Sequence, residues 1–180
     1  MKVIETDVHG VVVLEPLLFG DHRGYFFESY NERTAGIHGL TARFVQDNES
    51  FSEKAGVLRG LHYQIGEDAQ AKLVRVASGS IFDVAVDIRK GSETFGRWFG
   101  TVLSARNKRQ LYVPKGMAHG FCTLEAETTV LYKADAFYHA ASDRGIRWDD
   151  PHLAIDWPVD VPILSGKDES LPSWEDANFE

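Results

Sequence analysis

The segment GVLRGLHYQ contains the first candidates for chemistry, because Arg59 and His62 interrupt a run of otherwise apolar residues. A neutral imidazole is a suitable general base, since its unperturbed pKa of about 6.5 lies near working pH. Lys72 opens the next strand-like segment, after the loop-like stretch IGEDAQA. If a hairpin turn is centred near Glu67, antiparallel pairing places His62 opposite Lys72. A lone strand histidine is usually a core or edge residue, but a histidine beside a lysine in one cavity is costly unless it has a use.

Three more segments carry candidate groups. His119 follows a Pro/Gly turn in YVPKGMAHGF, and Tyr132 shares a strand face with Val130 in TVLYKAD. A tyrosine at such a position is typical of an inward-facing core aromatic. Lys167 and Asp168 follow an apolar stretch in PILSGKD, where two charges are more typical of a solvent-facing loop. From the pattern alone, a structural role stays open for each of them.

The elements that must position these residues are mostly short strands. Residues 81–89 alternate with period two, which separates two faces made of Phe82, Val84, Val86 and Ile88 and of Asp83, Asp87 and Arg89. The segment KLVRV (72–76) precedes them across the turn signal ASGS and predicts a hairpin. Similar runs predict strands at 11–19, 24–30, 42–45, 57–64, 97–104, 110–113 and 129–134. Short helices are expected near 31–37 and 174–177. The pattern therefore predicts an all-β sandwich, jelly roll or small barrel.

The motifs of common cofactor sites are missing. Jelly-roll proteins often bind a metal through a His-x-His pair and a nearby Glu, whereas His62 is followed by Tyr63, Gln64 and Glu67 without a second histidine. First-row metals need several well-placed nitrogen or oxygen ligands. The chain also has no phosphate-binding loop, glycine-rich dinucleotide turn, G-x-S-x-G or H-E-x-x-H motif. We therefore expect a site without metal or cofactor, assembled from scattered side chains.

Length and charge limit the class of protein. A chain of 180 residues fits one domain, and 27 acidic against 19 basic residues give a net charge of -8. Such a surface repels phosphate backbones, so we expect no nucleic-acid partner, although one small anion in a local basic pocket is compatible with it. The single cysteine, Cys122, excludes an intramolecular disulfide and a cysteine-based zinc site. The chain has no apolar run long enough to predict a membrane span or a secretory signal. We therefore expect a cytoplasmic protein.

In their order and spacing, the motifs of the chain resemble those of the dTDP-4-dehydrorhamnose 3,5-epimerase family. The resemblance covers nearly all 180 residues and rests on the segments RGYFFESY, FVQDNES, GVLRGLHYQ, AKLVRV, IFDVAVDIR, VPKGMAHGF, VLYK, RGIRWDDP, IDWP and PILSGKD. It implies an all-β, cupin-type jelly roll with a few short peripheral helices, formed by residues 1–180 as one domain. It further implies a homodimer in which N-terminal strands are exchanged, no cofactor, and a dTDP-4-keto-6-deoxy sugar as substrate.

The resemblance also implies roles for individual residues. His62 matches the catalytic base and Asp168 the carboxylate that orients it, while Lys72 matches the group that stabilises the enolate oxygen. Tyr132 matches the proton donor on the opposite face of the sugar. Further positions match substrate contacts, with Arg23 and Glu28 reaching the neighbouring subunit's site and Tyr138 lying against the thymine: Arg23, Glu28, Gln46, Asp47, Asn48, Arg59, His119, Tyr138, Asp143 and Lys167.

One position departs from the family pattern. The family commonly has Glu where this chain has Asp143, so the nucleotide contact of this residue is expected to be lost or bridged by water.

Three other functions remain to be distinguished. A C-3-only epimerase of a secondary-metabolite pathway would have the same catalytic residues. A metal-dependent cupin oxygenase would show tightly bound metal. A catalytically dead sugar-nucleotide-binding protein is disfavoured, because base, carboxylate, lysine and phenol are all present.

Overall fold

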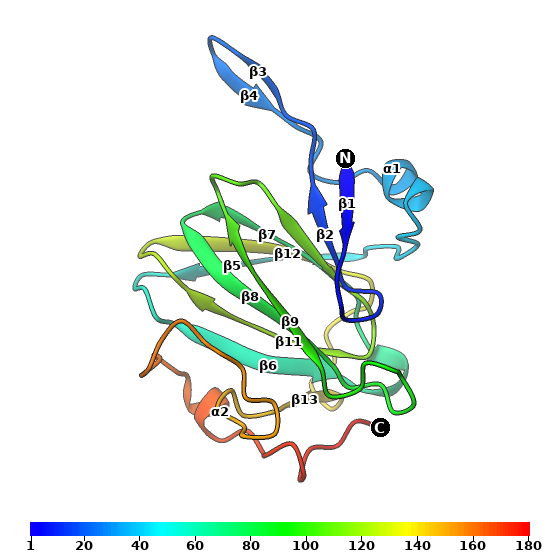
Figure 1. The fold of residues 1–180 in the computed structure, drawn as a ribbon, viewed down its shortest axis with the longest axis vertical. Coiled ribbons are helices and arrows are strands. Elements are labelled where there is room, and N and C mark those ends of the chain that lie inside the picture. The colour runs from blue at the N-terminus through cyan, green and yellow to red at the C-terminus, as the bar shows by residue number, and fades with distance from the viewer.

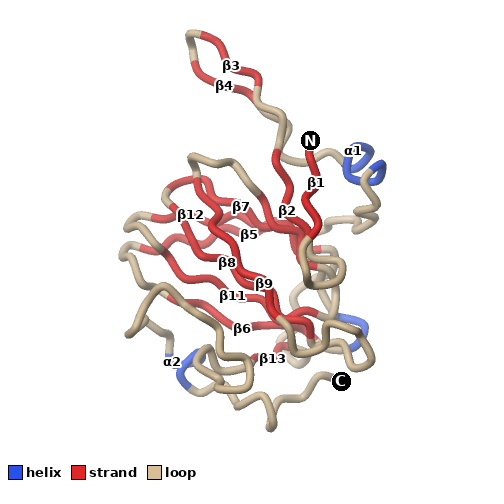
Figure 2. Tube along the Cα trace, viewed as in Figure 1, coloured by secondary structure: helices blue, strands red, loops and turns tan.

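The computed structural model describes residues 1–180 and consists mainly of two antiparallel sheets that face each other (Figures 1 and 2). The six-stranded sheet has the order β1 (Lys2–Glu5), β2 (Val12–Glu15), β10 (Gln110–Val113), β7 (Lys72–Ser78), β12 (Thr128–Ala134), β5 (Gln46–Ser52). The five-stranded sheet has the order β13 (Asp143–Gly145), β6 (Leu58–Gln64), β11 (Met117–Thr123), β8 (Ser80–Asp87), β9 (Trp98–Ser104). The remaining elements are the hairpin β3 (Phe19–Asp21) and β4 (Gly24–Phe26), the helices α1 (Glu32–Ile37) and α2 (Gly166–Glu169), and a single turn of 3-10 helix at Gly66–Asp68. The prediction of an all-β jelly roll with short peripheral helices is confirmed.

Successive strands in the middle of the chain belong to different sheets. β6 pairs with β11 and β13, whereas β7 pairs with β10 and β12, and β8 returns to the five-stranded sheet. Both predicted hairpins, 62–72 and 72–89, are therefore wrong. At the second crossing Gly79 has φ +76°, and a Cβ there would lie 2.2 Å from Thr128 Oγ1. The same turn-forming residues occur in hairpins within one sheet and in crossovers between two sheets. The sequence pattern therefore did not distinguish a hairpin from a crossover.

Both faces of the five-stranded sheet are buried. One face contributes Ala85 and Phe121 to an apolar cluster between the sheets, and the other contributes Val84 and Val86 to a second cluster. The C-terminal segment, orange to red in Figure 1, covers this second cluster and adds Trp174 to it. The predicted separation of residues 81–89 into two faces is confirmed, but the face that carries the aspartates is the barrel interior.

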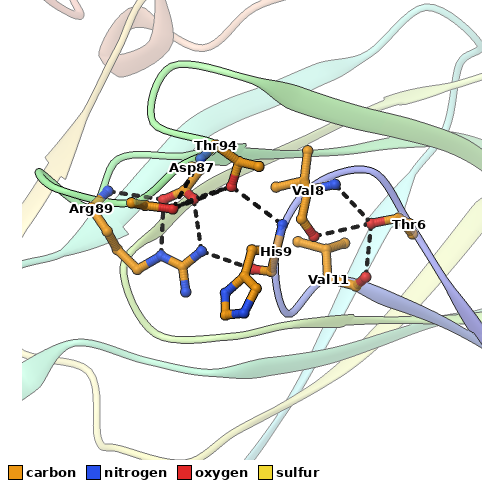
Figure 3. Close-up of polar contacts among 8 residues, drawn as sticks. Thr6, Val8, His9, Val11, Asp87, Arg89 and Thr94 are labelled. Atoms are coloured by element: carbon orange, nitrogen blue, oxygen red, sulfur yellow. Dashed lines mark hydrogen bonds and ion pairs between the residues drawn. The ribbon is translucent and has the colours of Figure 1, made fainter.

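Asp87 on this inner face anchors the turn between β1 and β2 (Figure 3). Its carboxylate accepts hydrogen bonds from Arg89, Ser92 and Thr94, while Arg89 donates to the carbonyl oxygen of His9 at 2.7 Å and Thr94 Oγ1 accepts from the His9 amide. Burial alone raises the pKa of Asp87, but the bonds from Arg89, Ser92 and Thr94 outweigh it and hold the pKa well below its usual range.

The peripheral elements are only partly as predicted. The helix expected near 31–37 is α1, where Asn31 caps the amide groups of Arg33 and Thr34. The helix expected at 174–177 is a turn, and α2 was not predicted. The β3–β4 hairpin projects from the sheets in Figure 1 and exposes Phe19 and Phe26. None of the helices has the length and apolar character needed to cross a membrane.

Candidate active site

A cavity of about 520 Å³ is lined by residues of both sheets. The five-stranded sheet contributes three of the predicted site residues and the six-stranded sheet contributes Lys72 and Tyr132, while Asp168 enters from α2. The structure therefore brings six predicted residues together, although His62 is not paired with Lys72. The complete lining is Glu49, Ser50, Phe51, Arg59, His62, Lys72, His119, Phe121, Tyr132, Ser165 and Asp168.

A bulge in β6 places Arg59 and His62 on the same face. Arg59 lies opposite Phe121 and His62 lies opposite His119, so two residues of β6 face the single residue Gly120 of β11. Residues three apart in a regular strand point to opposite faces. Because their partners are only two apart, the bulge directs the guanidinium and the imidazole into one cavity.

His62 and Asp168 form the closest pair of titratable groups in the cavity lining. His62 Nε2 lies 2.7 Å from Asp168 Oδ1, although the angle at Nε2 is too bent for a directed hydrogen bond. The same oxygen accepts from the Gly60 amide at 3.2 Å, and Ser165 Oγ donates to Oδ2 at 2.6 Å. Burial alone raises the pKa of Asp168, but the contacts from His62, Ser165 and Gly60 outweigh it and lower the pKa to about 2. Asp168 is therefore a carboxylate that can hold a proton on Nε2 and leave Nδ1 as the basic atom.

A second histidine–aspartate pair lies deeper in the barrel. His119 Nε2 is 2.8 Å from Asp83 Oδ1, and Asp83 has no exposed surface. The other carboxylate oxygen, Oδ2, is buried without a hydrogen-bond partner. Asp83 was not among the predicted site residues. The alternation of residues 81–89 places Asp83 on the face that carries the aspartates. Had that face been assigned to the barrel interior, the sequence would have identified Asp83 as a site residue.

Lys72 and Tyr132 form the opposite wall of the cavity. Tyr132 pairs with Val74 across the β7–β12 ladder, so Lys72, two residues earlier, shares its face, and Lys72 Nζ lies 5.9 Å from the centre of the ring. Burial lowers the pKa of Lys72 to about 8, Asp83 and Asp143 oppose this change, and Lys167 adds to it. Burial also raises the pKa of Tyr132, which keeps the phenol protonated.

Arg59 is the guanidinium of the cavity. It donates from Nη2 to the carbonyl oxygen of Phe51 at 3.2 Å and to Ser52 Oγ at 3.4 Å. Its buried Nε has no hydrogen-bond partner. A guanidinium with a free donor next to a cavity suits a phosphate or carboxylate oxygen.

Five of the predicted contacts form a polar group outside the cavity lining. Asp143 is ion-paired with Lys167 and accepts a hydrogen bond from the Tyr138 hydroxyl at 3.1 Å. Gln46 accepts from the Tyr138 amide at 3.0 Å and donates to Asn48 Oδ1 at 2.9 Å. Asp143 is thus already paired within the protein. That its nucleotide contact is lost or bridged by water stays a prediction.

The last three predicted residues lie neither in the cavity lining nor in this polar group. Arg23 is 78% exposed at the tip of the β3–β4 hairpin and pairs with Asp21. Glu28 follows the hairpin and accepts from Asn31. Asp47 points away from the barrel interior and is ion-paired with Lys133 in the exposed part of the sheet.

Ser165 was missed as a site residue, although its sequence carries a signal. It precedes α2 as the N-cap, and its hydroxyl both accepts from the Asp168 amide and donates to the Asp168 carboxylate. The segment SGKD has the S-x-x-[DE] spacing of a capping box. No three His, Cys, Asp or Glu side chains are grouped so that they could hold a metal ion.

The chain is similar to known proteins over nearly its whole length. The family model for dTDP-4-dehydrorhamnose 3,5-epimerase matches residues 5–176. A dTDP-4-dehydrorhamnose 3,5-epimerase from Shigella flexneri is 52% identical over 99% of this chain and 99% of its own. The crystal structure of a dTDP-4-dehydrorhamnose 3,5-epimerase from Bacillus anthracis with TDP and PPi bound is 56% identical, covers 96% of this chain and 98% of its own, and has a TM-score of 0.94.

Two further structures bear on specificity. A dTDP-6-deoxy-D-glucose-3,5-epimerase from Legionella pneumophila, solved with dTDP-4-keto-L-rhamnose, is 49% identical over 96% of this chain and 92% of its own, with a TM-score of 0.90. A 3'-monoepimerase from Streptomyces bikiniensis, solved with dTDP-quinovose, is more distant, at 33% identity over 94% of this chain and 86% of its own and a TM-score of 0.87. With a family model that matches nearly every residue and relatives of this similarity, the chain belongs to the dTDP-4-dehydrorhamnose 3,5-epimerase family.

Proposed function

We propose that this chain epimerises dTDP-4-dehydro-6-deoxy-D-glucose at C-3 and C-5 to dTDP-4-dehydro-L-rhamnose, in dTDP-rhamnose biosynthesis. The observation that carries the proposal is the 2.7 Å contact of His62 and Asp168 in a cavity whose opposite wall bears Lys72 and Tyr132. Inversion beside a ketone needs a base on one face of the carbon and an acid on the other. Two facing sheets supply these groups from two sides of a bound sugar ring.

His62 is the base of each half-reaction. Its imidazole takes the proton on the carbon next to the C-4 ketone, and the electrons of the broken C–H bond form the enolate. Asp168 holds the ring in the required tautomer and stabilises the imidazolium that forms. The imidazolium then loses its proton to solvent before the second carbon reacts.

Lys72 and Tyr132 act on the enolate. The Lys72 ammonium lies in a half-buried position, where its charge stabilises the negative C-4 oxygen more than it would in water. As the enolate collapses, its electrons form the new C–H bond with the proton of the Tyr132 hydroxyl, from the face opposite to His62. The phenolate recovers a proton from solvent.

The remaining predicted contacts bind the nucleotide and orient the sugar. Arg59, with its unpartnered Nε, is proposed to bind the pyrophosphate, and Tyr138 to lie against the thymine. The other proposed contacts of the same chain are Gln46, Asn48, His119, Asp143 and Lys167. Asp47 lies on the outer face of its sheet, paired with Lys133, and is not included. Binding through the nucleotide keeps the sugar in a reactive orientation without joining in the chemistry.

We further propose a homodimer in which the N-terminal strands are exchanged. The β3–β4 hairpin leaves its own barrel with apolar side chains exposed, and its two candidate residues, Arg23 and Glu28, lie away from their own cavity. Reaching the cavity of a second copy would give both features a use. We place the enzyme in the cytoplasm, and its one buried cysteine is compatible with a reducing compartment.

The test is incubation of the dTDP-4-keto-6-deoxy sugar in deuterated water with the purified protein. Incorporation of deuterium at both C-3 and C-5 is expected. Label at C-3 alone would assign the chain to the C-3 epimerases instead, and no label at either carbon would refute epimerisation. Metal analysis of the same sample separates a third outcome, because stoichiometric iron, nickel or manganese would indicate a metal-dependent cupin.

A further inference from the structure

The bulge of β6 contacts the proposed catalytic carboxylate through its own backbone. The Gly60 amide donates to Asp168 Oδ1 at 3.2 Å, and His62 Nε2 lies 2.7 Å from the same oxygen. Asp168 is buried, so a hydrogen bond to its charge is not shared with solvent. The orientation of the carboxylate therefore depends on where the bulge holds this amide.

Glycine is required on both sides of this contact. Gly60 has φ +119°, and a Cβ there would lie 2.6 Å from the Gly120 Cα and 2.7 Å from the His119 carbonyl oxygen. A Cβ on Gly120 would lie 2.8 Å from the Arg59 carbonyl oxygen. All of these neighbours are backbone atoms, which do not move aside as a side chain does. The two glycines let β6 and β11 approach closely enough for the bulge to form.

We propose that Gly60 and Gly120 are positioning residues of the reaction: their close approach shapes the bulge, and the Gly60 amide orients Asp168 toward His62. One backbone feature then has two effects, because the same bulge turns Arg59 and His62 to one face. This inference rests on the proposed function, since it concerns the proposed base and its carboxylate. The positioning group is a backbone amide and not a side chain.

The sharpest test removes only the Gly60 N–H, by incorporating glycolic acid at position 60 so that an ester replaces the amide. The control is the same ester at Gly91, whose amide makes no hydrogen bond. We expect kcat to fall roughly tenfold to a hundredfold, as for loss of one hydrogen bond to a charged group. Affinity for dTDP should stay within twofold of the wild type.

An NMR titration of the His62 imidazole gives a readout that does not depend on turnover. Without the amide, Asp168 is a stronger acceptor, so the titration midpoint of His62 should move to higher pH in the Gly60 ester and not in the Gly91 ester. An unchanged midpoint would overturn the inference, whether or not kcat falls. If the wild-type protein does not exchange deuterium, only the proposed function fails, because the midpoint still tests the contact.

Gly120→Ala tests the close approach, with Gly36→Ala as the matched control, since a Cβ on Gly36 meets no atom within 4 Å. We expect Gly120→Ala to lower kcat and shift the His62 midpoint, and Gly36→Ala to change neither. Wild-type activity in a folded Gly120→Ala protein would overturn the role of Gly120. If that variant does not fold, the ester pair decides the proposal alone.

Discussion

His62 and His119 lie directly opposite each other in the β6–β11 pair, yet each contacts a different buried aspartate. The side chain of His62 is 28% exposed and that of His119 is 8% exposed. His119 is aligned for a hydrogen bond with Asp83, whereas His62 is not yet aligned with Asp168. Catalytic hydrogen bonds often tighten only when substrate binds. The more accessible and less constrained ring is the one suited to move a proton.

We expect His62→Asn to lower kcat by roughly 10²- to 10⁴-fold, the usual contribution of a general base. Affinity for dTDP should be nearly intact, because the imidazole is proposed to act on the sugar. Deuterium exchange and calorimetric dTDP binding measure the two effects. His38→Asn, in an exposed position after α1, is the control. A loss of dTDP affinity as large as the loss of kcat would instead assign His62 a structural role.

Tyr132→Phe should separate proton removal from proton return. The variant retains the ring that packs on the core but lacks the hydroxyl. We expect net epimerisation to fall by roughly 10²-fold or more, while the solvent exchange of the substrate proton that His62 removes continues. Tyr112→Phe is a matched control, because Tyr112 is also partly buried but packs outside the barrel. Equal loss of exchange and epimerisation would contradict the assignment of Tyr132 as the separate acid.

The fall of kcat/KM at high pH (the alkaline limb) should follow the deprotonation of the Lys72 ammonium. Because the ammonium is the useful form and its pKa is lowered to about 8, activity should fall as pH rises through this value. Asp83→Asn removes a charge that raises this pKa, so the limb should move to lower pH, and Lys72→Arg should move it far to higher pH. Profiles between pH 6 and 10 measure the shift. A limb at the same pH in all three proteins would exclude Lys72 as its source.

Mixing two inactive variants tests whether Arg23 acts across the proposed dimer. In a hybrid of His62→Asn and Arg23→Ala subunits, one cavity has both defects and the other has neither. After unfolding and joint refolding we expect about a quarter of the wild-type sites to be active, from random pairing in a two-fold dimer. The same mixture without refolding is the control. Activity no higher than that of the separate variants would place Arg23 in its own subunit's site or outside any site.

Asp87→Ala should destabilise the fold by about 3–5 kcal/mol, because it leaves the partly buried Arg89 without its partner. Asp149→Ala breaks the more exposed pair with Arg147 and should lower the free energy of unfolding much less. Urea unfolding measures both free energies. Since the pKa of Asp87 is lowered, its stabilisation is fully present above a pH of about 4 and is lost as pH falls through the folded-state pKa. The difference between wild type and Asp87→Ala should therefore shrink below pH 4 and stay constant near neutrality.

Sequence patterns predicted the strands better than their pairing. The strand predicted at 110–113 coincides with β10, and the one at 57–64 differs from β6 by one residue. Period-two alternation is a local property, so it can be read from neighbouring residues. Which sheet a strand joins depends on contacts between residues distant in sequence. The pairing of His62 with Lys72 was wrong for that reason, although both residues line the same cavity.

Side-chain candidates were predictable where a reactive residue type interrupts an apolar run, as His62 does. The contributions of Gly60 and Asp83 were not predictable in this way. Gly60 acts through an amide that every residue but proline has, and its position follows from a bulge visible only in the register of β6 and β11. Asp83 resembles an ordinary surface residue of a two-sided strand until the sheet is known to be covered on both faces.

Because the chain crosses between sheets after β6, the proposed base and the proposed enolate stabiliser stand on layers that share no backbone hydrogen bonds. Their separation is thus set by the thickness of the core between the layers, ordinarily about 10 Å for facing sheets. Val74 and Phe121 belong to the core that lies between the layers. Trimming them would change the width of the reaction chamber as well as the stability of the protein, so that catalytic rate and resistance to unfolding are adjusted by the same methyl groups and rings.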